Sequence, residues 1–183
     1  MKKSERANRV VDIFDKIYPD VKCTLNYSNP LEMLIATQLS AQCTDARVNI
    51  VTDSLFKKYR CAEDFARADR VELENDIRSA GFYRNKAKNI IACCQRLIDV
   101  YDGKVPDTME DLLTLPGTGR KTANLVLGDV YKQPAVVVDT HCIRLSNRIG
   151  LVNSEDPVKI EYDLKKLIPP QRQLKLCHQL VHH

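Results

Sequence analysis

The amino-acid sequence predicts an all-α protein. Apolar residues recur at helical spacing along most of the chain, and cap residues, prolines or glycines mark where these stretches begin and end. Only 6 of the 183 residues are glycine, and residues that favour helices dominate the composition. With 44% hydrophobic and 28% charged residues, the chain has the composition of a soluble globular protein with a sizeable core.

About ten helices are expected, joined by short connections into two lobes. The first covers residues 5–18 and ends before a proline. Asn29, Pro30 and Glu32 then form a start signal, because they combine a cap residue, proline at the first helical position and glutamate at the third. The helix that follows, 31–40, is apolar nearly all round and is expected to be buried. The remaining helices are expected at 44–56, 69–81, 85–101, 108–115, 120–131, 140–149, 157–168 and 171–183.

The charge balance and the cysteines narrow the class of protein. A net charge of +4 and a pI near 8.6 are compatible with a nucleic-acid partner. No apolar run is long enough to span a membrane, and the first residues do not form a signal or transit peptide, so we expect a cytoplasmic protein with no membrane partner. Seven cysteines without a C-x-x-C pair predict reduced thiols, most of them packed in cores, and no metal site.

Residues 115–123, with the sequence LPGTGRKTA, predict a glycine hairpin that opens a helix. Pro116 cannot continue the preceding helix, and Gly117 and Gly119 allow a tight turn with exposed backbone. A tight turn between two core helices is the simpler interpretation, since short glycine motifs occur by chance. Cations gain nothing at a helix N-terminus, however, so a cluster of cations and hydroxyls there favours an anionic backbone as the ligand. This cluster consists of Thr118, Arg120, Lys121 and Thr122.

Lys121 is the candidate nucleophile. A lysine beside the positive end of a helix dipole has its ammonium form destabilised, which favours the free amine. An extended apolar stretch, 136–138, leads to Asp139, a carboxylate that can take the proton. From spacing alone, an equally good interpretation is that Lys121 clamps a phosphate and that Asp139 caps the helix after it.

These residues resemble the endonuclease III family of helix–hairpin–helix DNA glycosylases. The resemblance rests on residues 115–123 together with 138–141, VDTH. It extends to 39–45, LSAQCTD, and to 81–87, GFYRNKA. These matches occur in the expected order and cover almost all of the chain from Asn29 onward.

The resemblance implies a particular architecture. We expect a six-helix, barrel-like domain over residues 22–133, with the helix–hairpin–helix at about 108–131. The second helical domain is expected to combine residues 1–21 with 134–183. In the family, the active site lies in the cleft between the two lobes.

The resemblance also implies the reaction. The family removes oxidised or saturated pyrimidines from double-stranded DNA and then cuts the strand at the abasic sugar, which requires extrusion of the base from the duplex. Lys121 is expected to attack the sugar and form an imine that permits β-elimination. Asp139 is expected to accept the lysine proton or to stabilise positive charge on the sugar. Asp45 and His141 match positions near the pocket, for which helix capping and structural hydrogen bonds are equally good explanations.

Further residues match positions that contact DNA in the family. Gly117 and Gly119 are expected to offer backbone amides to a phosphate. Gln42 and Phe82 match positions that fill the gap left by the extruded nucleotide. The second is usually leucine, and an aromatic ring in its place can still stack between bases. The expected contacts are completed by Thr118, Arg120, Thr122 and Arg144.

The C-terminal end is the largest departure from the family. Relatives usually continue past a His-His-Gly segment into four closely spaced cysteines that hold a 4Fe-4S cluster. This chain ends at His182-His183, where that segment begins, and none of its seven cysteines matches the cluster positions. We therefore expect no cofactor within residues 1–183, and a cluster only in a protein that continues beyond His183. We also expect a monomer.

Alternative functions lie within the superfamily and outside enzymes. The adenine-mismatch branch generally lacks a lysine at the position of Lys121 and carries a glutamate in the region of Gln42, so it is disfavoured. The alternative function of a thymine-mismatch glycosylase is not excluded by the sequence. Nor does the sequence exclude a truncated relative that binds DNA through its hairpin with weak or no turnover.

Overall fold

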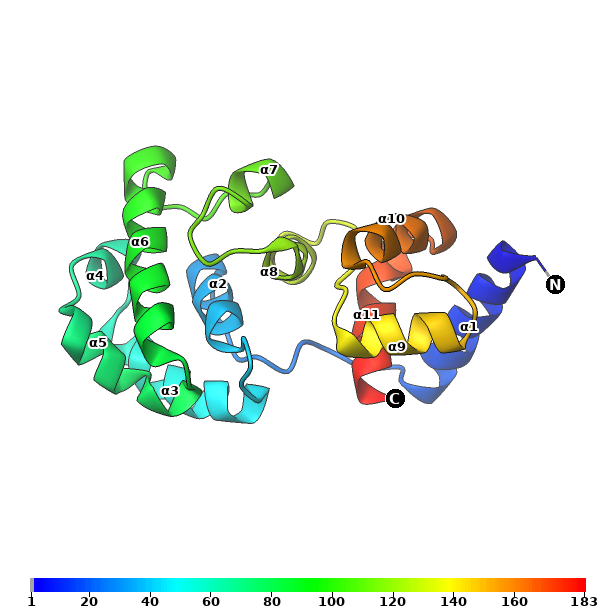
Figure 1. Ribbon diagram of the computed structural model, residues 1–183, viewed down its shortest axis with the longest axis horizontal. Coiled ribbons are helices and arrows are strands. Elements are labelled where there is room, and N and C mark those ends of the chain that lie inside the picture. The colour runs from blue at the N-terminus through cyan, green and yellow to red at the C-terminus, as the bar shows by residue number, and fades with distance from the viewer. Residues whose placement is uncertain (1) are drawn as a thin grey trace. The chain divides into compact units, whose positions relative to one another are not determined.

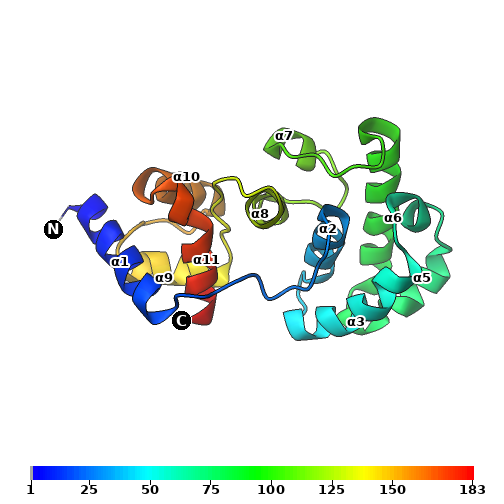
Figure 2. The same cartoon turned by 180° about the vertical axis from the view of Figure 1, so that it is seen from behind.

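The computed structural model describes residues 2–183 and, within them, forms eleven α-helices and no strand (Figures 1 and 2). The predicted all-α class is confirmed. The α-helices are α1 Lys3–Ile17, α2 Pro30–Leu39, α3 Asp45–Lys58, α4 Ala62–Ala66, α5 Arg70–Asp76, α6 Tyr83–Tyr101, α7 Met109–Leu112, α8 Arg120–Leu125, α9 Thr140–Arg148, α10 Pro157–Leu167 and α11 Gln173–His182. Short 3-10 turns lie at η1 Arg78–Ala80 and η3 Pro170–Arg172, and a π-turn, η2 Val126–Val130, continues α8.

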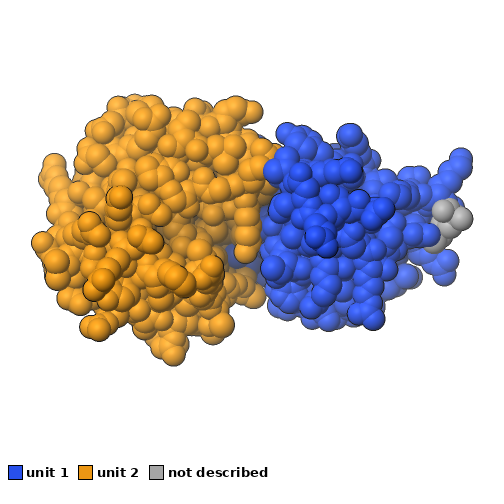
Figure 3. Space-filling view, viewed as in Figure 1, with its two compact units in different colours: residues 1–23, 127–183 blue, residues 24–126 orange. Residues whose placement is uncertain are grey.

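The chain divides into two compact units, coloured separately in Figure 3. Unit 2 is the continuous stretch 24–126, whereas unit 1 combines both ends of the chain, up to residue 23 and from residue 127. The predicted domains, 22–133 and its flanks, stay a prediction, and the unit boundary near the hairpin falls earlier, inside the helical stretch that α8 and η2 form. Within the described residues, no helix is both long and apolar enough to cross a membrane.

Unit 2 is built around α2 and α6. Every residue from Met33 to Leu39 is buried, as the nearly all-apolar sequence predicts. The start signal also forms: the Asn29 side chain accepts the Glu32 amide at 2.9 Å, and the Glu32 carboxylate accepts the Ser28 amide at 2.6 Å. The helix α6 packs against α2, α4 and α5, and α8 packs against α2 and α7. The hairpin before α8 therefore rests on the most buried helix of its unit.

Several predicted boundaries differ from those of the structure. The helix α4 is not predicted from the sequence, since five residues are too few to show a helical period. The predicted helix 69–81 ends at Asp76, and the 3-10 turn η1 then buries Ala80 before Gly81 adopts a φ of 72°. The helix α6 begins two residues before the predicted start, at Tyr83.

Unit 1 brings the two ends of the chain together, because α1 packs against α10 and α11. Asp15 on α1 is at the centre of this contact. It accepts hydrogen bonds from Arg172 and, at 2.9 Å, from Gln179, and the Lys175 amine lies 3.0 Å away. Burial opposes ionisation of Asp15, but the three donors outweigh it and lower the pKa of this carboxyl to about 2.

Candidate functional site

A buried glutamine of α2 holds the glycine hairpin in place through hydrogen bonds. Gln38 Nε2 donates to the carbonyl oxygen of Pro116 at 3.2 Å and to the Thr118 hydroxyl at 3.4 Å. Gly117 has a φ of 76°, in the left-handed region that favours glycine. A Cβ atom at this position would lie 2.9 Å from Asn89 Cβ and 3.0 Å from Gln38 Oε1. Only glycine therefore fits the turn, for reasons of both conformation and space.

Gly119 differs from Gly117, and the sequence analysis treated the two alike. Gly119 caps α8 with extended backbone, φ −99° and ψ 178°, which any residue can adopt. Of the two glycines, Gly117 has the backbone conformation that favours glycine, and Gly119 does not. A Cβ atom there would meet nothing within 4 Å. Its lack of a side chain instead leaves space beside the first turn of α8, where the backbone of a partner can approach closely.

The side chains around the hairpin separate into exposed and buried groups. Lys121, the second residue of α8, is exposed, as the role of nucleophile requires. Thr118 and Thr122 are each only 9% exposed, and the Thr118 amide donates to Leu115 O at 3.1 Å. These two threonines thus serve the packing of the hairpin, whereas Lys121 faces solution.

Unit 2 contains a hollow of about 260 Å³ that is lined by three residues predicted to contact DNA. These residues are Gln42, Phe82 and Gly117. Gln42 follows α2, and Phe82 precedes α6 with 64% of its surface exposed. Both residues have left-handed backbone, with φ of 53° and 47°. For a residue with a side chain this conformation costs about 1–2 kcal/mol, so the surrounding structure must hold it in place.

In unit 1, α9 carries the other predicted residues. Asp139 is its N-cap and accepts the Cys142 amide with Oδ1 at 2.7 Å, which is the capping role anticipated for it. The cap uses one of the two carboxylate oxygens. His141 and Arg144 lie one turn apart, with Arg144 Nη2 3.5 Å from His141 Nδ1. Lys121 belongs to unit 2 and Asp139 to unit 1.

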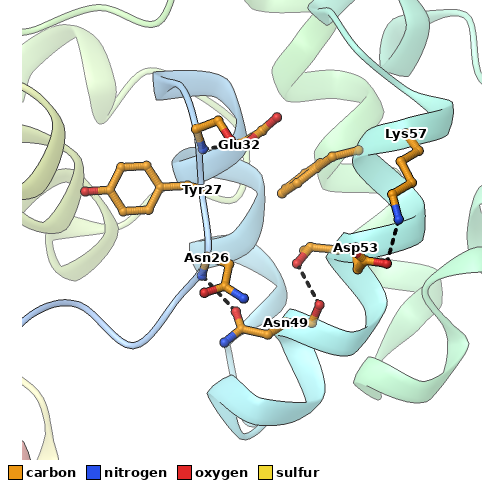
Figure 4. Close-up of a pocket in the computed structure, with 9 residues that line it drawn as sticks. Asn26, Tyr27, Glu32, Asn49, Asp53 and Lys57 are labelled. Atoms are coloured by element: carbon orange, nitrogen blue, oxygen red, sulfur yellow. Dashed lines mark hydrogen bonds and ion pairs between the residues drawn. The ribbon is translucent and has the colours of Figure 1, made fainter.

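Asp45 has a structural partner. It is the first residue of α3, and its carboxylate accepts a hydrogen bond from the Thr24 hydroxyl. Asn49, one turn later, accepts the Asn26 amide and donates to Thr24 O, both at 2.8 Å. These hydrogen bonds hold segment 24–28 beside a second hollow, which is lined by polar side chains that include Glu32, Asn49 and Asp53 (Figure 4). Structural hydrogen bonding is thus one observed role of Asp45.

The cysteines of residues 2–183 do not fit an iron–sulfur cluster, which needs four thiolates at one point. All seven are free thiols, and no group of three histidine, cysteine or acidic side chains in this part of the chain can hold a metal ion. Cys93 and Cys94 are buried in α6, and burial raises the pKa of the Cys93 thiol to about 11. No step below involves a cluster.

Sequence reasoning missed two buried polar residues of unit 2, Gln38 and Lys86. Both line the hollow that contains Gln42 and Phe82. A signal existed for each: Gln38 is a polar residue in the mostly apolar stretch 33–39, and Lys86 lies four residues before Ile90 on the buried face of α6. A polar side chain at a core position of a helix needs a partner, and that partner cannot be read from the spacing.

The glycine hairpin and the lysine-bearing helix that it opens lie in a region of the chain that matches DNA repair proteins. Residues 35–170 match the HhH-GPD superfamily of base excision DNA repair proteins, so the chain belongs to that superfamily. Within it, the chain is a member of the endonuclease III family. It is 49% identical to endonuclease III of Synechocystis over 182 residues, which cover 99% of this chain and 83% of the relative.

Other relatives agree with this assignment. Endonuclease III of Bacillus subtilis is 43% identical over 93% of this chain and 78% of its own length. A solved structure of endonuclease III, trapped as a covalent intermediate with DNA, has a TM-score of 0.94 at 45% identity, covering 99% of this chain and 85% of the other. A thermostable thymine-DNA glycosylase, at 22% identity and a TM-score of 0.84, shares the fold.

Proposed function

We propose that Lys121 is the nucleophile with which this chain, a bifunctional DNA glycosylase and abasic-site lyase of base excision repair, removes oxidised pyrimidines from double-stranded DNA. One observation carries the proposal. An exposed lysine follows the glycine hairpin in a chain that is 45% identical to an endonuclease III trapped covalently on DNA. A covalent intermediate requires a nucleophilic side chain, and an exposed amine can attack an extruded sugar.

The reaction proceeds in two stages. The Lys121 amine attacks the anomeric carbon of the sugar, and the bond to the damaged base breaks with its electron pair leaving on the base. The attached nitrogen then loses a proton to the Asp139 carboxylate, and its lone pair expels the ring oxygen. The C1′–O4′ bond breaks, O4′ takes up a proton, and a protonated imine is left on the opened sugar. The imine acidifies the adjacent carbon, so removal of a proton there expels the 3′ phosphate by β-elimination. Water finally hydrolyses the imine and releases Lys121.

The hairpin contributes to DNA binding in this proposal. Gly119 leaves room for a phosphate to approach the first turn of α8. Arg120 and, on α9, Arg144 supply positive charge that attracts the backbone. Gln42 and Phe82, from their exposed loops beside one hollow, fill the space vacated by the extruded nucleotide. In this proposal the chain acts as a monomer, with no cofactor bound within residues 1–183 and a 4Fe-4S cluster only in a protein that continues beyond His183.

Borohydride trapping tests the lysine. Incubation with a duplex containing an abasic site, followed by reduction, should give a covalent adduct with the unaltered chain and none with Lys121→Ala. Lys104→Ala, which removes an exposed lysine after α6, should trap normally. An undiminished adduct with Lys121→Ala contradicts the proposal.

The substrate is tested by comparing two duplexes. One contains thymine glycol, an oxidised pyrimidine, and the other a G·T mismatch. Faster excision of thymine glycol supports the proposed specificity, and faster excision of mismatched thymine identifies the thymine-mismatch alternative. Tight binding of both without excision identifies the binding-only alternative.

A further inference from the structure

Lys86 is a buried cation between two loops of unit 2. Only 6% of the residue is exposed, and its Nζ donates to the carbonyl oxygens of Leu39 and Ala80, each at 2.8 Å. Desolvation by burial lowers the pKa of this ammonium. Lysine is seldom fully buried, so its presence here calls for a role specific to this position.

The two carbonyl oxygens come from equivalent places. Leu39 is the last residue of α2, and Ala80 is the last residue of η1. Carbonyl groups in the final turn of a helix lack partners within that helix and lie at the negative end of its dipole. The Lys86 ammonium therefore supplies a donor to one carbonyl oxygen at each of these two ends and links the ends together.

Each helix end leads directly into a loop with strained backbone. Gln42 follows Leu39 by three residues, and Phe82 follows Ala80 by two. Both have left-handed φ although neither is glycine. The Lys86 amide also donates to Phe82 O at 3.1 Å, so Lys86 contacts the second loop through both its main chain and its side chain. The two exposed side chains line the same hollow as Lys86.

We propose that Lys86 is a positioning residue that holds the Gln42 and Phe82 loops at a fixed separation, so that both side chains enter the DNA duplex as one unit. The inference rests on the proposed function only in that these side chains fill the space left by the extruded nucleotide. A flexible stem with several donors at its tip can reach two carbonyl groups at once. Methionine in its place fills similar volume and leaves both oxygens without a donor.

The test measures insertion separately from chemistry. The duplex contains tetrahydrofuran, an uncleavable abasic analogue, opposite 2-aminopurine, whose fluorescence rises when it is unstacked. With the unaltered protein at saturation, we expect a clear rise.

Lys86→Met should reduce the rise and slow single-turnover excision of thymine glycol from duplex DNA by roughly 10- to 100-fold, as misplacement on the order of 1 Å does. Borohydride trapping on a single-stranded abasic site, where no gap must be filled, should change by less than about threefold, because positioning through Lys86 then matters little.

Two variants control the comparison. Lys57→Met, on a lysine side chain that is 73% exposed, should behave as the unaltered chain. Lys86→Arg, which keeps the charge and the donors, should restore most of the fluorescence rise. If Lys86→Met does not fold, Lys86→Gln, which keeps a shorter donor, takes its place.

The possible results are distinct. A selective loss on duplex DNA, with rescue by arginine, supports the proposal. Equal losses on single-stranded and duplex DNA, or an unchanged fluorescence rise, overturn it. Fluorescence is also measured in the Lys121→Ala background, where it reports insertion without catalysis. Failure of the lysine mechanism and failure of the Lys86 proposal are therefore separately visible.

Discussion

Gln38 donates a hydrogen bond to Pro116 O at 3.2 Å, across 78 positions of sequence, and so ties the core of unit 2 to the glycine hairpin. Gln38 is buried and the bond is partly buried, so water competes with it less than at an exposed site. The conformation of the hairpin thus depends on a buried side chain of α2.

Replacing Gln38 by leucine should loosen the hairpin. The change leaves Pro116 O without its donor and should lower the free energy of unfolding by about 1–2 kcal/mol. Affinity for a duplex with an uncleavable abasic analogue should fall as well. Urea denaturation and fluorescence anisotropy measure the two effects. Gln95→Leu, on the exposed side of α6, should change neither, and equal losses in both variants would refute the role of Gln38.

The two hairpin glycines should respond differently to alanine. Gly117→Ala combines a left-handed φ with contacts of 2.9 and 3.0 Å, so it should destabilise the protein by about 1–3 kcal/mol. Gly119→Ala meets no atom and should change stability by less than about 0.5 kcal/mol. Its effect should instead be on DNA affinity, because the new methyl group obstructs an approaching phosphate. Thermal denaturation and anisotropy distinguish these outcomes, and unchanged affinity in Gly119→Ala would argue against that contact.

Asp139→Asn should separate the capping role from the chemical role. Asparagine caps helices as well as aspartate, so stability should change by less than about 0.5 kcal/mol. The loss of the carboxylate should slow excision by roughly 10²- to 10⁴-fold, the usual contribution of a general base.

Asp156→Asn is the matched control for that change. Asp156 caps α10 by accepting the Val158 amide at 2.8 Å, and no chemistry is assigned to it. If Asp139→Asn excises the base at the normal rate, Asp139 has no chemical role and serves only to cap α9.

Asp15 should contribute stability that depends on pH. Its pKa is about 2 in the folded protein and 3.8 for the ordinary group. Since the folded value is the lower one, the contribution is complete well above pH 3.8 and disappears as the pH falls from there toward 2. Asp15→Asn should therefore cost on the order of 1–2 kcal/mol at pH 7. Urea denaturation at pH 7, 5, 4 and 3 should show the difference from the unaltered chain shrinking only at the two lowest values.

Local signals in the sequence were sufficient for most of the helices. The start signal at Asn29 is predicted from the sequence, and its side chain accepts the Glu32 amide. The side chains of Thr44, Asp69, Thr108 and Asp156 likewise cap the starts of helices that are predicted near these positions. A cap requires only residues within one helical turn, so it can be read directly from the chain. The short helix α4 left no such signal, because its stability depends on packing of Ala62 and Phe65 against the rest of unit 2.

The site was predictable to a different degree. The identity of the hairpin and of Lys121 followed from a contiguous motif, and the family assignment is confirmed. The roles of Gln38 and Lys86 did not follow, because each depends on a carbonyl group brought close by tertiary folding. The catalytic pairing of Lys121 with Asp139 stays a prediction that the variants above test.

The division of the chain has a consequence for its synthesis. Unit 2 is continuous, so a ribosome releases all of its residues before most of unit 1 exists. The first helix, α1, cannot pack until α10 and α11 have been synthesised. Until then its buried residues, Ala7, Val11 and Phe14, lack the helices against which they pack. During that interval the nascent chain displays an amphipathic helix that lacks its cover, which is the kind of surface that chaperones bind. The order of translation thus makes the N-terminal helix among the last elements to reach its final packing.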